Sequence, residues 1–280
     1  MTKPTLLLVD NGSNRAESVL NLHRLATGLS LATGQEIHPV SLQHAESIPA
    51  GSLNGRPADT FVPFMRQRVA LGERSFLLLP LFFGPSRALT SFIPEQVGHL
   101  EAAFGPIDLR LAPVLCPLPE GEPRLASILV EQLLAAAGGE TPRRVILVDH
   151  GSPEPRVTAV RRYLAEQLQS RLGPPLKLLQ AAMERREDNL YDFNGEPLEH
   201  VLEQAAVEDA ETPMFLSLLF LSPGRHAGRG GDIESICDVV RRRHPHLSIA
   251  TSALIGEHPE LIVILRDRLA TGLKEATNPG

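Results

Sequence analysis

The chain of 280 residues contains two copies of one sequence unit, and this repeat limits its fold more than any other feature. The segment Leu6–Ser13 aligns with Val145–Ser152, and Phe82–Ala88 aligns with Phe220–His226. The two copies keep an offset of about 139 positions along the chain. A steady offset indicates that a whole unit is duplicated, so one fold must occur twice.

The repeat predicts two tandem modules, residues 1–138 and 143–280. The segment Gly138–Pro142 between them has the turn-forming residues expected of a link between units. In each module four short, solidly apolar segments alternate with longer amphipathic ones, a pattern typical of parallel strands covered on both faces. We therefore expect an α/β fold with one four-stranded parallel sheet per module, in the order 2-1-3-4, and helices on both faces.

The apolar segments place the strands and the amphipathic segments place the helices. The expected strands are Thr5–Val9, Glu36–Leu42, Ser75–Phe83, Ile107–Val114, Arg144–Asp149, Leu176–Ala181, Met214–Leu221 and Leu247–Ala253. The expected helices are Arg15–Ala32, Asp59–Ala70, Leu89–Ala103, Arg124–Ala137, Val157–Leu172, Pro197–Ala206, Ile233–Arg242 and Glu260–Leu273.

Each module serves as a control for the other. His150 stands where the first module has Asn11, and His226 stands where it has Ala88. Residues that both copies share, such as Gly12 and Gly151, are explained by the shared fold. Residues that differ are candidates for chemistry. We therefore interpret His150 and His226 as a functional pair that belongs to the second module.

Both histidines follow the carboxyl end of an expected strand, the first and the third of their module. In a 2-1-3-4 sheet these strands are neighbours, and ligands bind outside their carboxyl ends. Glu184 follows the second strand, which lies on the other side of the first, so we expect its carboxylate to reach the same crevice. The alternative interpretation is an exposed charge in the run Glu184–Asp188.

Two imidazoles and a carboxylate suit proton removal or the transient binding of a divalent metal ion. The sequence has no HExxH motif and no cysteine cluster, so a permanently held structural zinc ion is not expected. The loop Gly224–Asp232 has four glycines and should be mobile. Arg225 and Arg229 in this loop are candidates for pairing with carboxylates of a ligand, and Ser152 is a further candidate substrate-binding residue.

Overall composition argues against several classes of protein. A formal charge of −6 does not suit a nucleic-acid-binding surface. The two cysteines, Cys116 and Cys237, form neither a metal motif nor a disulfide framework. No apolar run approaches the roughly 20 residues of a membrane helix, and no signal peptide is recognisable. We expect a cytoplasmic monomer or homodimer that binds neither nucleic acid nor membrane.

These motifs resemble those of a known family. The segments Val148–Ser152 and Leu219–His226, with Glu184, Asp232-Ile233 and Ile255–Pro259, are similar to motifs of the class II sirohydrochlorin chelatases of CbiX/SirB type. The resemblance covers the chain as two chelatase-like modules, of which the first is degenerate. It implies a lyase of siroheme or cobalamin biosynthesis that inserts Co²⁺, Fe²⁺ or Ni²⁺ into sirohydrochlorin, or a related tetrapyrrole, without ATP.

The paired histidines of the family fall on His150 and His226, and its acidic partner falls on Glu184. The resemblance therefore implies these three as catalytic residues and as ligands of the metal, which is a substrate and not a permanently bound cofactor. The other substrate would be a tetrapyrrole with carboxylate side chains. Two features depart from the family: the active pair lies in the second module instead of the first, and the segment 185–193 looks inserted.

Two other functions compete with this one. A non-catalytic carrier that binds a tetrapyrrole or delivers metal would use the same side chains. A histidine-dependent phosphatase built on His150 is disfavoured, because Asp149 precedes that histidine where an arginine would be expected.

Overall fold

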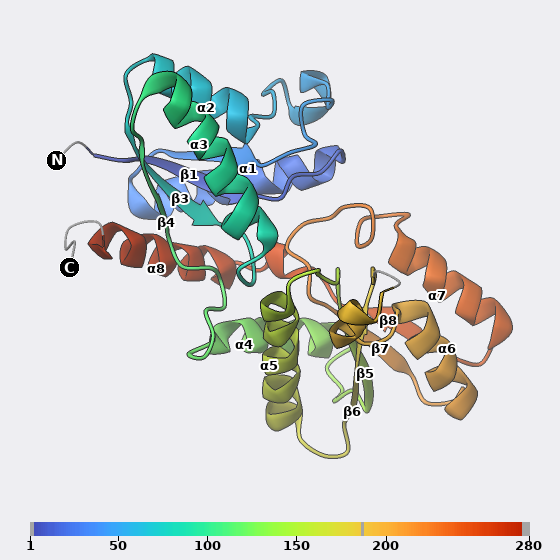
Figure 1. Ribbon diagram of the computed structural model, residues 1–280. Coiled ribbons are helices and arrows are strands. Elements are labelled where there is room, and N and C mark those ends of the chain that lie inside the picture. The colour runs from blue at the N-terminus through green and yellow to red at the C-terminus, as the bar shows by residue number, and fades with distance from the viewer. Residues whose placement is uncertain (1–2, 186–187, 276–280) are drawn as a thin grey trace. The chain divides into compact units, whose positions relative to one another are not determined.

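The computed structural model describes residues 3–185 and 188–275. This part of the chain contains two four-stranded parallel sheets with helices on both faces (Figure 1). Their strand orders are β2-β1-β3-β4 and β6-β5-β7-β8. The predicted fold class and the predicted order 2-1-3-4 are therefore confirmed in both modules.

The first module begins with a strand and alternates strands with helices. Its strands are β1 (Thr5–Asp10), β2 (Ile37–Ser41), β3 (Ser75–Pro80) and β4 (Asp108–Leu111). Its helices are α1 (Ala16–Thr33), α2 (Phe61–Ala70), α3 (Ile93–Phe104) and α4 (Pro123–Ala136), with a short 3₁₀ helix η1 (Ala50–Leu53) after β2 and a π-helical turn η2 (Ala88–Phe92) before α3.

The second module repeats this order of elements. Its strands are β5 (Arg144–Asp149), β6 (Lys177–Ala182), β7 (Met214–Leu218) and β8 (Ile249–Thr251). Its helices are α5 (Pro155–Leu172), α6 (Leu198–Glu208), α7 (Asp232–Arg243) and α8 (Glu260–Glu275), with the 3₁₀ helices η3 (Asn189–Asn194) and η4 (Ile255–Glu257). Strands β7 and β8 are shorter than predicted, because the chain leaves the hydrogen-bonded ladder before its apolar run ends.

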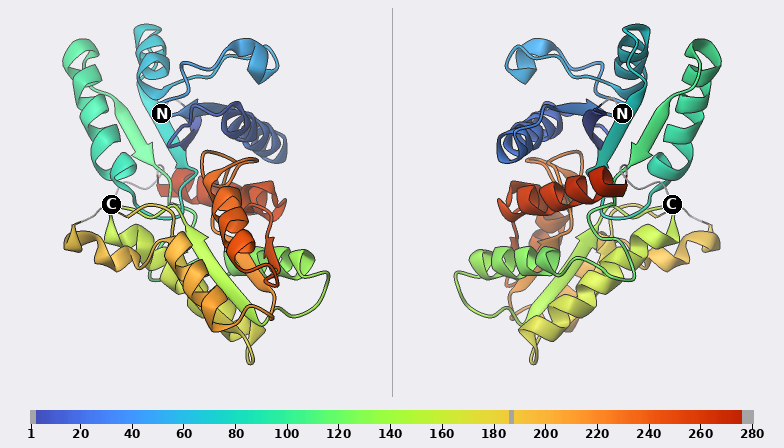
Figure 2. Two further views of the ribbon diagram at one scale, coloured as in Figure 1. Left: turned by 90° about the vertical axis from the view of Figure 1, so that its right-hand side faces the viewer. Right: turned by 90° about the vertical axis from the view of Figure 1, so that its left-hand side faces the viewer.

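The last helix of each sequence half packs in the compact unit of the other half. One compact unit comprises residues 1–117 and 259–280, and the other comprises residues 118–258. Helix α8 packs beside α1 on the first sheet, whereas α4 packs beside α5 on the second (Figures 1 and 2). The compact units therefore differ from the predicted modules 1–138 and 143–280, because similarity between the halves does not reveal which sheet an apolar helix will cover.

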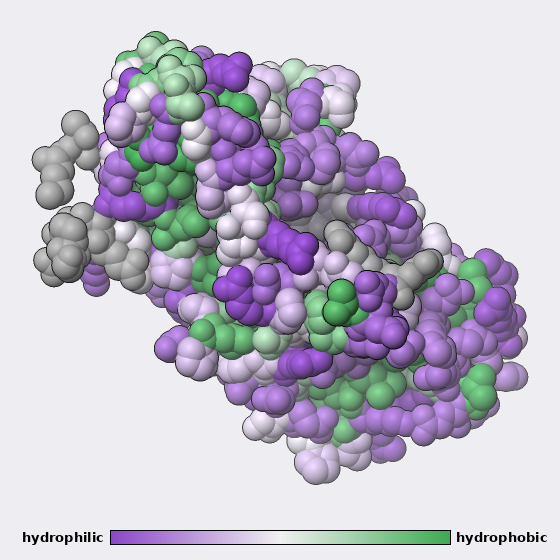
Figure 3. Space-filling model, viewed as in Figure 1, coloured by the Kyte–Doolittle hydropathy of each residue, from purple (hydrophilic) through white to green (hydrophobic). Residues whose placement is uncertain are grey.

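The surface seen in Figure 3 is mostly hydrophilic, with hydrophobic residues in small separate groups. Within the described residues, no helix is both long and apolar enough to cross a membrane. Cys116 and Cys237 are buried and do not form a disulfide bond.

A close backbone approach explains the glycine that follows each strand-end position. Gly12 and Gly151 have φ angles of 85° and 83°, which favour glycine. A Cβ atom on Gly12 would lie 1.8 Å from the carbonyl oxygen of Gln43, and one on Gly151 would lie 2.0 Å from that of Glu184. The fold thus requires both glycines, and Gln43 is the structural equivalent of Glu184.

This equivalence allows the segment 185–193, which is predicted to be inserted relative to the family, to be compared with its counterpart in the first module. Nine residues separate Glu184 from Asn194, and ten residues, 44–53, separate Gln43 from Asn54. Each segment contains a short 3₁₀ helix: η1 ends just before Asn54, and η3 ends at Asn194. The segment after Glu184, in which Arg186 and Glu187 lie outside the described residues, is therefore one residue shorter than its counterpart and differs from it in composition.

A buried arginine ties the strand ends of the second module together. The Nη1 atom of Arg161 in α5 lies 2.5 Å from Oδ1 of Asp149 at the end of β5. The same guanidinium donates hydrogen bonds to the carbonyl oxygens of Ala181, at 3.0 Å, and Asn194, at 2.5 Å. Arg161 therefore neutralises a buried carboxylate while it fixes the end of β6 and the loop that follows.

The first module keeps the carboxylate but lacks this partner. Leu22 occupies the position in α1 that corresponds to Arg161. Asp10 is buried, and its Oδ1 atom has no hydrogen-bond partner among the described residues. Burial raises the pKa of Asp10 to about 6. The equivalent turn therefore carries an ionisable group without a compensating charge.

Asn194 holds the turn that follows β5. Its side chain is buried, and its Oδ1 atom accepts hydrogen bonds from the backbone N–H of Ser152, at 3.0 Å, and the hydroxyl of Thr158, at 2.9 Å. Its Nδ2 atom donates to the carbonyl oxygens of Ser152, at 2.8 Å, and Tyr191, at 3.3 Å. Both backbone groups of Ser152, two residues after His150, are thus fixed by one amide.

In the first module, apolar contacts fill the space beneath the turn after β1. Val19, Ala45 and Leu53 form a small buried cluster between α1 and η1. Asn54, the sequence counterpart of Asn194, is exposed and has a φ angle of 55°. The polar clamp on the strand-end turn therefore belongs to the second module.

Replacing Asp10 with Asn should stabilise the protein increasingly as the pH rises. Because the folded chain holds Asp10 at a pKa of about 6 against the ordinary 3.8, it favours the protonated carboxyl. The stability that protonated Asp10 adds to the folded chain is fully present below pH 3.8 and is lost as the pH rises through 6. The stability advantage of D10N over the wild type should therefore grow by about 2 kcal/mol between pH 4.5 and 7.5. Urea unfolding at both pH values measures it, and an advantage independent of pH would contradict this account.

Replacing Asn194 with Gly should destabilise the protein by about 3 kcal/mol, because four hydrogen bonds disappear and leave buried groups unsatisfied. Asn54→Gly is the matched control, since an exposed residue in the left-handed region accepts glycine without strain. Urea unfolding should show a change below about 0.5 kcal/mol for the control. Similar losses in both variants would mean that the clamp does not stabilise the turn.

Candidate functional site

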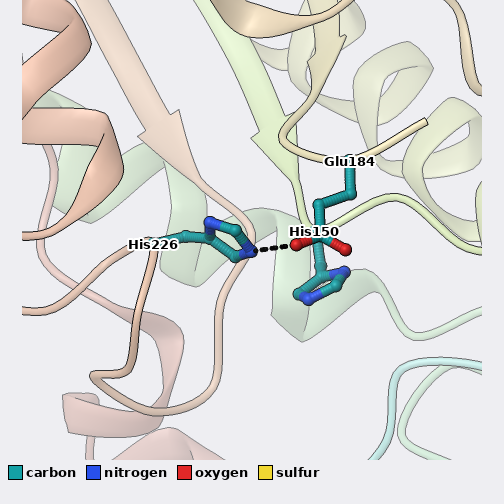
Figure 4. Close-up of side chains that lie close together, drawn as sticks. All are labelled: His150, Glu184 and His226. Carbon is teal, nitrogen blue, oxygen red and sulfur yellow. Dashed lines mark ion pairs between the residues drawn. The ribbon is translucent and has the colours of Figure 1, made fainter. Parts of the chain in front are cut away.

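Three side chains converge outside the carboxyl ends of the second sheet (Figure 4). His150 follows β5, Glu184 follows β6, and His226 lies in the loop between β7 and α7. The ring centroids of the two histidines are 4.8 Å apart, and the rings meet edge to face. Nε2 of His226 lies 3.2 Å from Oε1 of Glu184. One nitrogen or oxygen from each residue lies within 4.8 Å of the others, a spacing suited to ligands of one metal ion.

His226 is held in a defined orientation by Asp232. Nδ1 of its ring lies 2.8 Å from Oδ2 of Asp232, the first residue of α7. Both ring nitrogens face a carboxylate, and the shorter contact, to Asp232, favours the neutral tautomer with its proton on Nδ1. In this tautomer the Nε2 lone pair is directed at Glu184. Burial, followed by the neighbouring His150, lowers the pKa of His226. The ring therefore stays neutral to a lower pH than an ordinary histidine.

His150 and Glu184 are the exposed members of the group, and His226 is buried. The Nδ1 atom of His150 lies 3.3 Å from the carbonyl oxygen of Gly151, a contact in which the nitrogen must donate. Its backbone carbonyl accepts a hydrogen bond of 2.9 Å from the N–H of Glu184. This bond continues the pairing of β5 and β6, so the backbones of His150 and Glu184 are fixed to one another.

Arg225 takes part in the same charge cluster. Its guanidinium lies 3.5 Å from Glu184 and 3.2 Å from Asp232, although 71% of the side chain is exposed. Arg229 is exposed in the same loop. Ser152 lies in the turn after β5, where its hydroxyl accepts a hydrogen bond of 3.0 Å from the N–H of Glu154 just before α5. The structure thus places Arg225 beside the three converging residues and gives Ser152 a role in the turn.

The glycine-rich loop is wound tightly around His226. Its backbone closes on itself through hydrogen bonds from Gly228 to Gly224 and from Gly231 to Gly228, of 3.0 and 2.9 Å. A Cβ atom on Gly228 would lie 2.5 Å from the carbonyl oxygen of Gly224, and one on Gly231 would lie 2.6 Å from that of His226. These glycines are therefore needed for close packing within the loop.

A pocket of about 480 Å³ lies beside His150 and Glu184. Its lining comes from the turn after β5, the segment after β6 and the 3₁₀ helix η3: His150, Gly151, Ser152, Pro153, Met183, Glu184, Arg185, Tyr191, Asn194 and Pro197. A metal ion held by the three side chains would therefore be open to a ligand on this side, as catalytic metal sites require.

The equivalent positions of the first module carry no comparable group. Asn11, Gln43 and Ala88 replace the two histidines and the glutamate. Among the described residues, the group of side chains whose nitrogen and oxygen atoms lie close enough to share one metal ion is that of His150, Glu184 and His226. The chemistry suggested by the sequence is thus geometrically possible in the second module.

Asp232 was not assigned a function from the sequence, although it orients His226. Its position in the sequence could have indicated this role. Asp232 is an acidic residue six positions after His226, at the start of a predicted helix, from where its side chain can reach the preceding loop. Arg161 and Asn194 were also missed. Their contrast with Leu22 and the exposed Asn54 is visible only when the modules are compared in structure.

Comparison with known families gives a match for the second half of the chain. Residues 144–272 match the CbiX family model. A search of curated proteins gives no match to this sequence.

Solved structures share the fold over nearly the whole chain. SirB from Bacillus subtilis with Fe³⁺ has a TM-score of 0.70 and 16% identity, covering 99% of this chain and 98% of that one. SirB from Bacillus subtilis subspecies spizizenii in complex with cobalt has a TM-score of 0.64, 16% identity, and coverage of 99% and 97%. CbiX, the terminal enzyme for biosynthesis of siroheme in denitrifying bacteria, has a TM-score of 0.54, 16% identity, and coverage of 96% and 98%.

At these identities the structures show a common fold. Residues 144–272 are thus similar to the CbiX family, and the chain as a whole has the fold of the SirB structures.

Proposed function

We propose that the second module inserts a divalent metal ion into sirohydrochlorin, or a related tetrapyrrole, without ATP. The match of residues 144–272 to the CbiX family model supports a chelatase activity. One structure with the same fold is a sirohydrochlorin chelatase in complex with cobalt, and another holds Fe³⁺. In this function the protein is a lyase, and Co²⁺, Fe²⁺ or Ni²⁺ is its substrate.

The main support for this proposal is the contact between His226 and Glu184. The Nδ1–H group of His226 donates a hydrogen bond to Asp232, so the Nε2 lone pair faces a carboxylate oxygen 3.2 Å away. Two acceptors at this distance repel each other unless a proton or a cation lies between them. Burial lowers the pKa of His226 and disfavours the proton. A divalent cation is therefore the better-matched occupant.

Metal insertion requires a weak site for the ion and a base for the two pyrrole N–H protons. Unprotonated imidazole binds Co²⁺, Ni²⁺ and Fe²⁺, and a single carboxylate adds charge without a permanent cage. In our proposal His226 and Glu184 hold the ion, and His150 completes the set. Once the ion moves into the ring, the freed imidazole of His150, which is exposed at the pocket, accepts the two pyrrole protons one after the other and passes each to water.

Arginines in the loop after β7 suit the acidic substrate. Arg225 is largely exposed while it pairs with Glu184 and Asp232, so its guanidinium can exchange these partners for a substrate carboxylate. Arg229 in the same loop offers a second exposed cation. Ser152 lines the pocket and remains a candidate substrate contact.

A non-catalytic carrier of tetrapyrrole or metal is the second candidate function. The observation that favours it is the first module, where Asn11, Gln43 and Ala88 replace all three proposed ligands. A carrier would bind the metal through the second module and need no turnover.

Incubation with Co²⁺ and sirohydrochlorin should convert many equivalents of tetrapyrrole per protein chain, because the ion is released into the ring and the site is refilled. Absorption spectra over time measure the conversion against a protein-free reaction. A change limited to one equivalent would support the carrier instead, and no change above the protein-free rate would overturn the chelatase.

His150→Ala and His226→Ala should each reduce the insertion rate by about 10²-fold or more, since each removes a metal ligand or base. His226→Ala should also weaken Co²⁺ binding measured by titration calorimetry. His246→Ala, an exposed histidine of the same module outside the site, is the matched control and should retain the wild-type rate. Unfolding curves close to that of the wild type would show that the fold is intact, and full activity in either site variant would refute the assignment.

A further inference from the structure

We propose that Tyr191 is the aromatic surface on which the planar macrocycle lies, and that it determines which tetrapyrrole the site accepts. The inference rests on the proposed function and adds a specificity residue to it. Tyr191 lies in η3 and lines the same pocket as His150 and Glu184. A ring system held over the metal-binding side chains would therefore meet this side chain at the pocket wall.

The position of Tyr191 is fixed from several sides. Asp188 accepts a hydrogen bond of 3.0 Å from the N–H of Leu190 and begins the 3₁₀ helix. Arg185 binds the carboxylate of Asp192 at 2.6 Å. The side chain of Asn194 donates to the carbonyl oxygen of Tyr191 itself at 3.3 Å. Tyr191 is thus presented in place before a ligand arrives, which lowers the entropy cost of binding.

The same network joins Tyr191 to the metal-binding residues. Asn194 bonds the backbone of Tyr191 with one end of its amide and the backbone of Ser152 with both ends. Ser152 follows His150 by two residues. The aromatic wall and the proposed metal ligand are therefore set in register by one buried side chain, as a site for a rigid planar substrate would require.

Composition separates this segment from its counterpart. The helix η3 reads Asn-Leu-Tyr-Asp-Phe-Asn, whereas η1 reads Ala-Gly-Ser-Leu. The chain has two tyrosines and no tryptophan, so an aromatic ring at the pocket wall is not a product of general abundance. Aromatic side chains occur in this segment of the module that carries the metal-binding residues and not in the other.

The chemistry of a tetrapyrrole matches this wall. Its flat conjugated face stacks favourably on an aromatic ring, while its carboxylates stay in water or pair with arginine. Tyr191 is half-buried and lines the pocket, so part of its side chain faces the space that a ligand would occupy. The ring of Phe193, with its centroid 6.2 Å away, packs beside it.

The test compares Tyr191→Ala with Leu190→Ala in steady-state insertion of Co²⁺ into sirohydrochlorin. Leu190 is 75% exposed in the same 3₁₀ helix and does not line the pocket, which makes it the matched control. We expect Y191A to raise the KM for the tetrapyrrole about tenfold, while the Kd for Co²⁺ alone stays within about twofold. Tyr191→Phe, which keeps the ring, should recover most of this loss, and L190A should behave as the wild type.

A tetrapyrrole KM for Y191A equal to that of the wild type, or an equal rise in L190A, would overturn the role of Tyr191 while leaving the chelatase function intact. Failure of the wild type to turn over would instead overturn the proposed function. In that case absorbance titration with metal-free sirohydrochlorin gives the Kd of each variant and tests the wall by binding. Wild-type protein that does not bind the tetrapyrrole would overturn both.

Discussion

The second module depends on the buried ion pair between Asp149 and Arg161. Burying two charges costs much of what their attraction returns, so such a pair contributes less to stability than to the choice of one arrangement. Arg161 uses its remaining donors on the carbonyl oxygens at the end of β6 and before α6. Three segments that are distant in sequence, and that carry His150, Glu184 and Asn194, are thereby held at fixed distances from one guanidinium.

The two modules show two solutions to one geometric problem. Both need a sharp turn after the central strand, and both use glycine where another backbone passes within contact distance. The first module then fills the space beneath the turn with Val19, Ala45 and Leu53, whereas the second fills it with a hydrogen-bonded amide and a guanidinium. Apolar packing is tolerant of small shifts, but hydrogen bonds are directional. The stricter arrangement accompanies the side chains whose distances matter for binding a metal.

Much of the fold was predictable, because apolar strands and amphipathic helices leave a periodic signal that the repeat doubles. Strand β5 agrees with its predicted range, and the sheet order followed from the parallel architecture. The convergence of His150, Glu184 and His226 was also predictable, since strand ends of one sheet meet at one edge. Asp232 and Arg161 were not, because their roles depend on side-chain direction within helices. The exchange of α4 and α8 was not predictable either, since both helices present an apolar face that would suit either sheet.

That exchange has a consequence for the order in which the protein is made. The unit of residues 118–258 is continuous in sequence, so all of its strands and helices have emerged once residue 258 leaves the ribosome. The unit that contains β1–β4 must wait for α8 before the part of its sheet around β3 is covered beside α1. The half of the chain that is synthesised first therefore completes its core later, and the unit with the proposed metal-binding residues can fold while the other unit still exposes apolar surface.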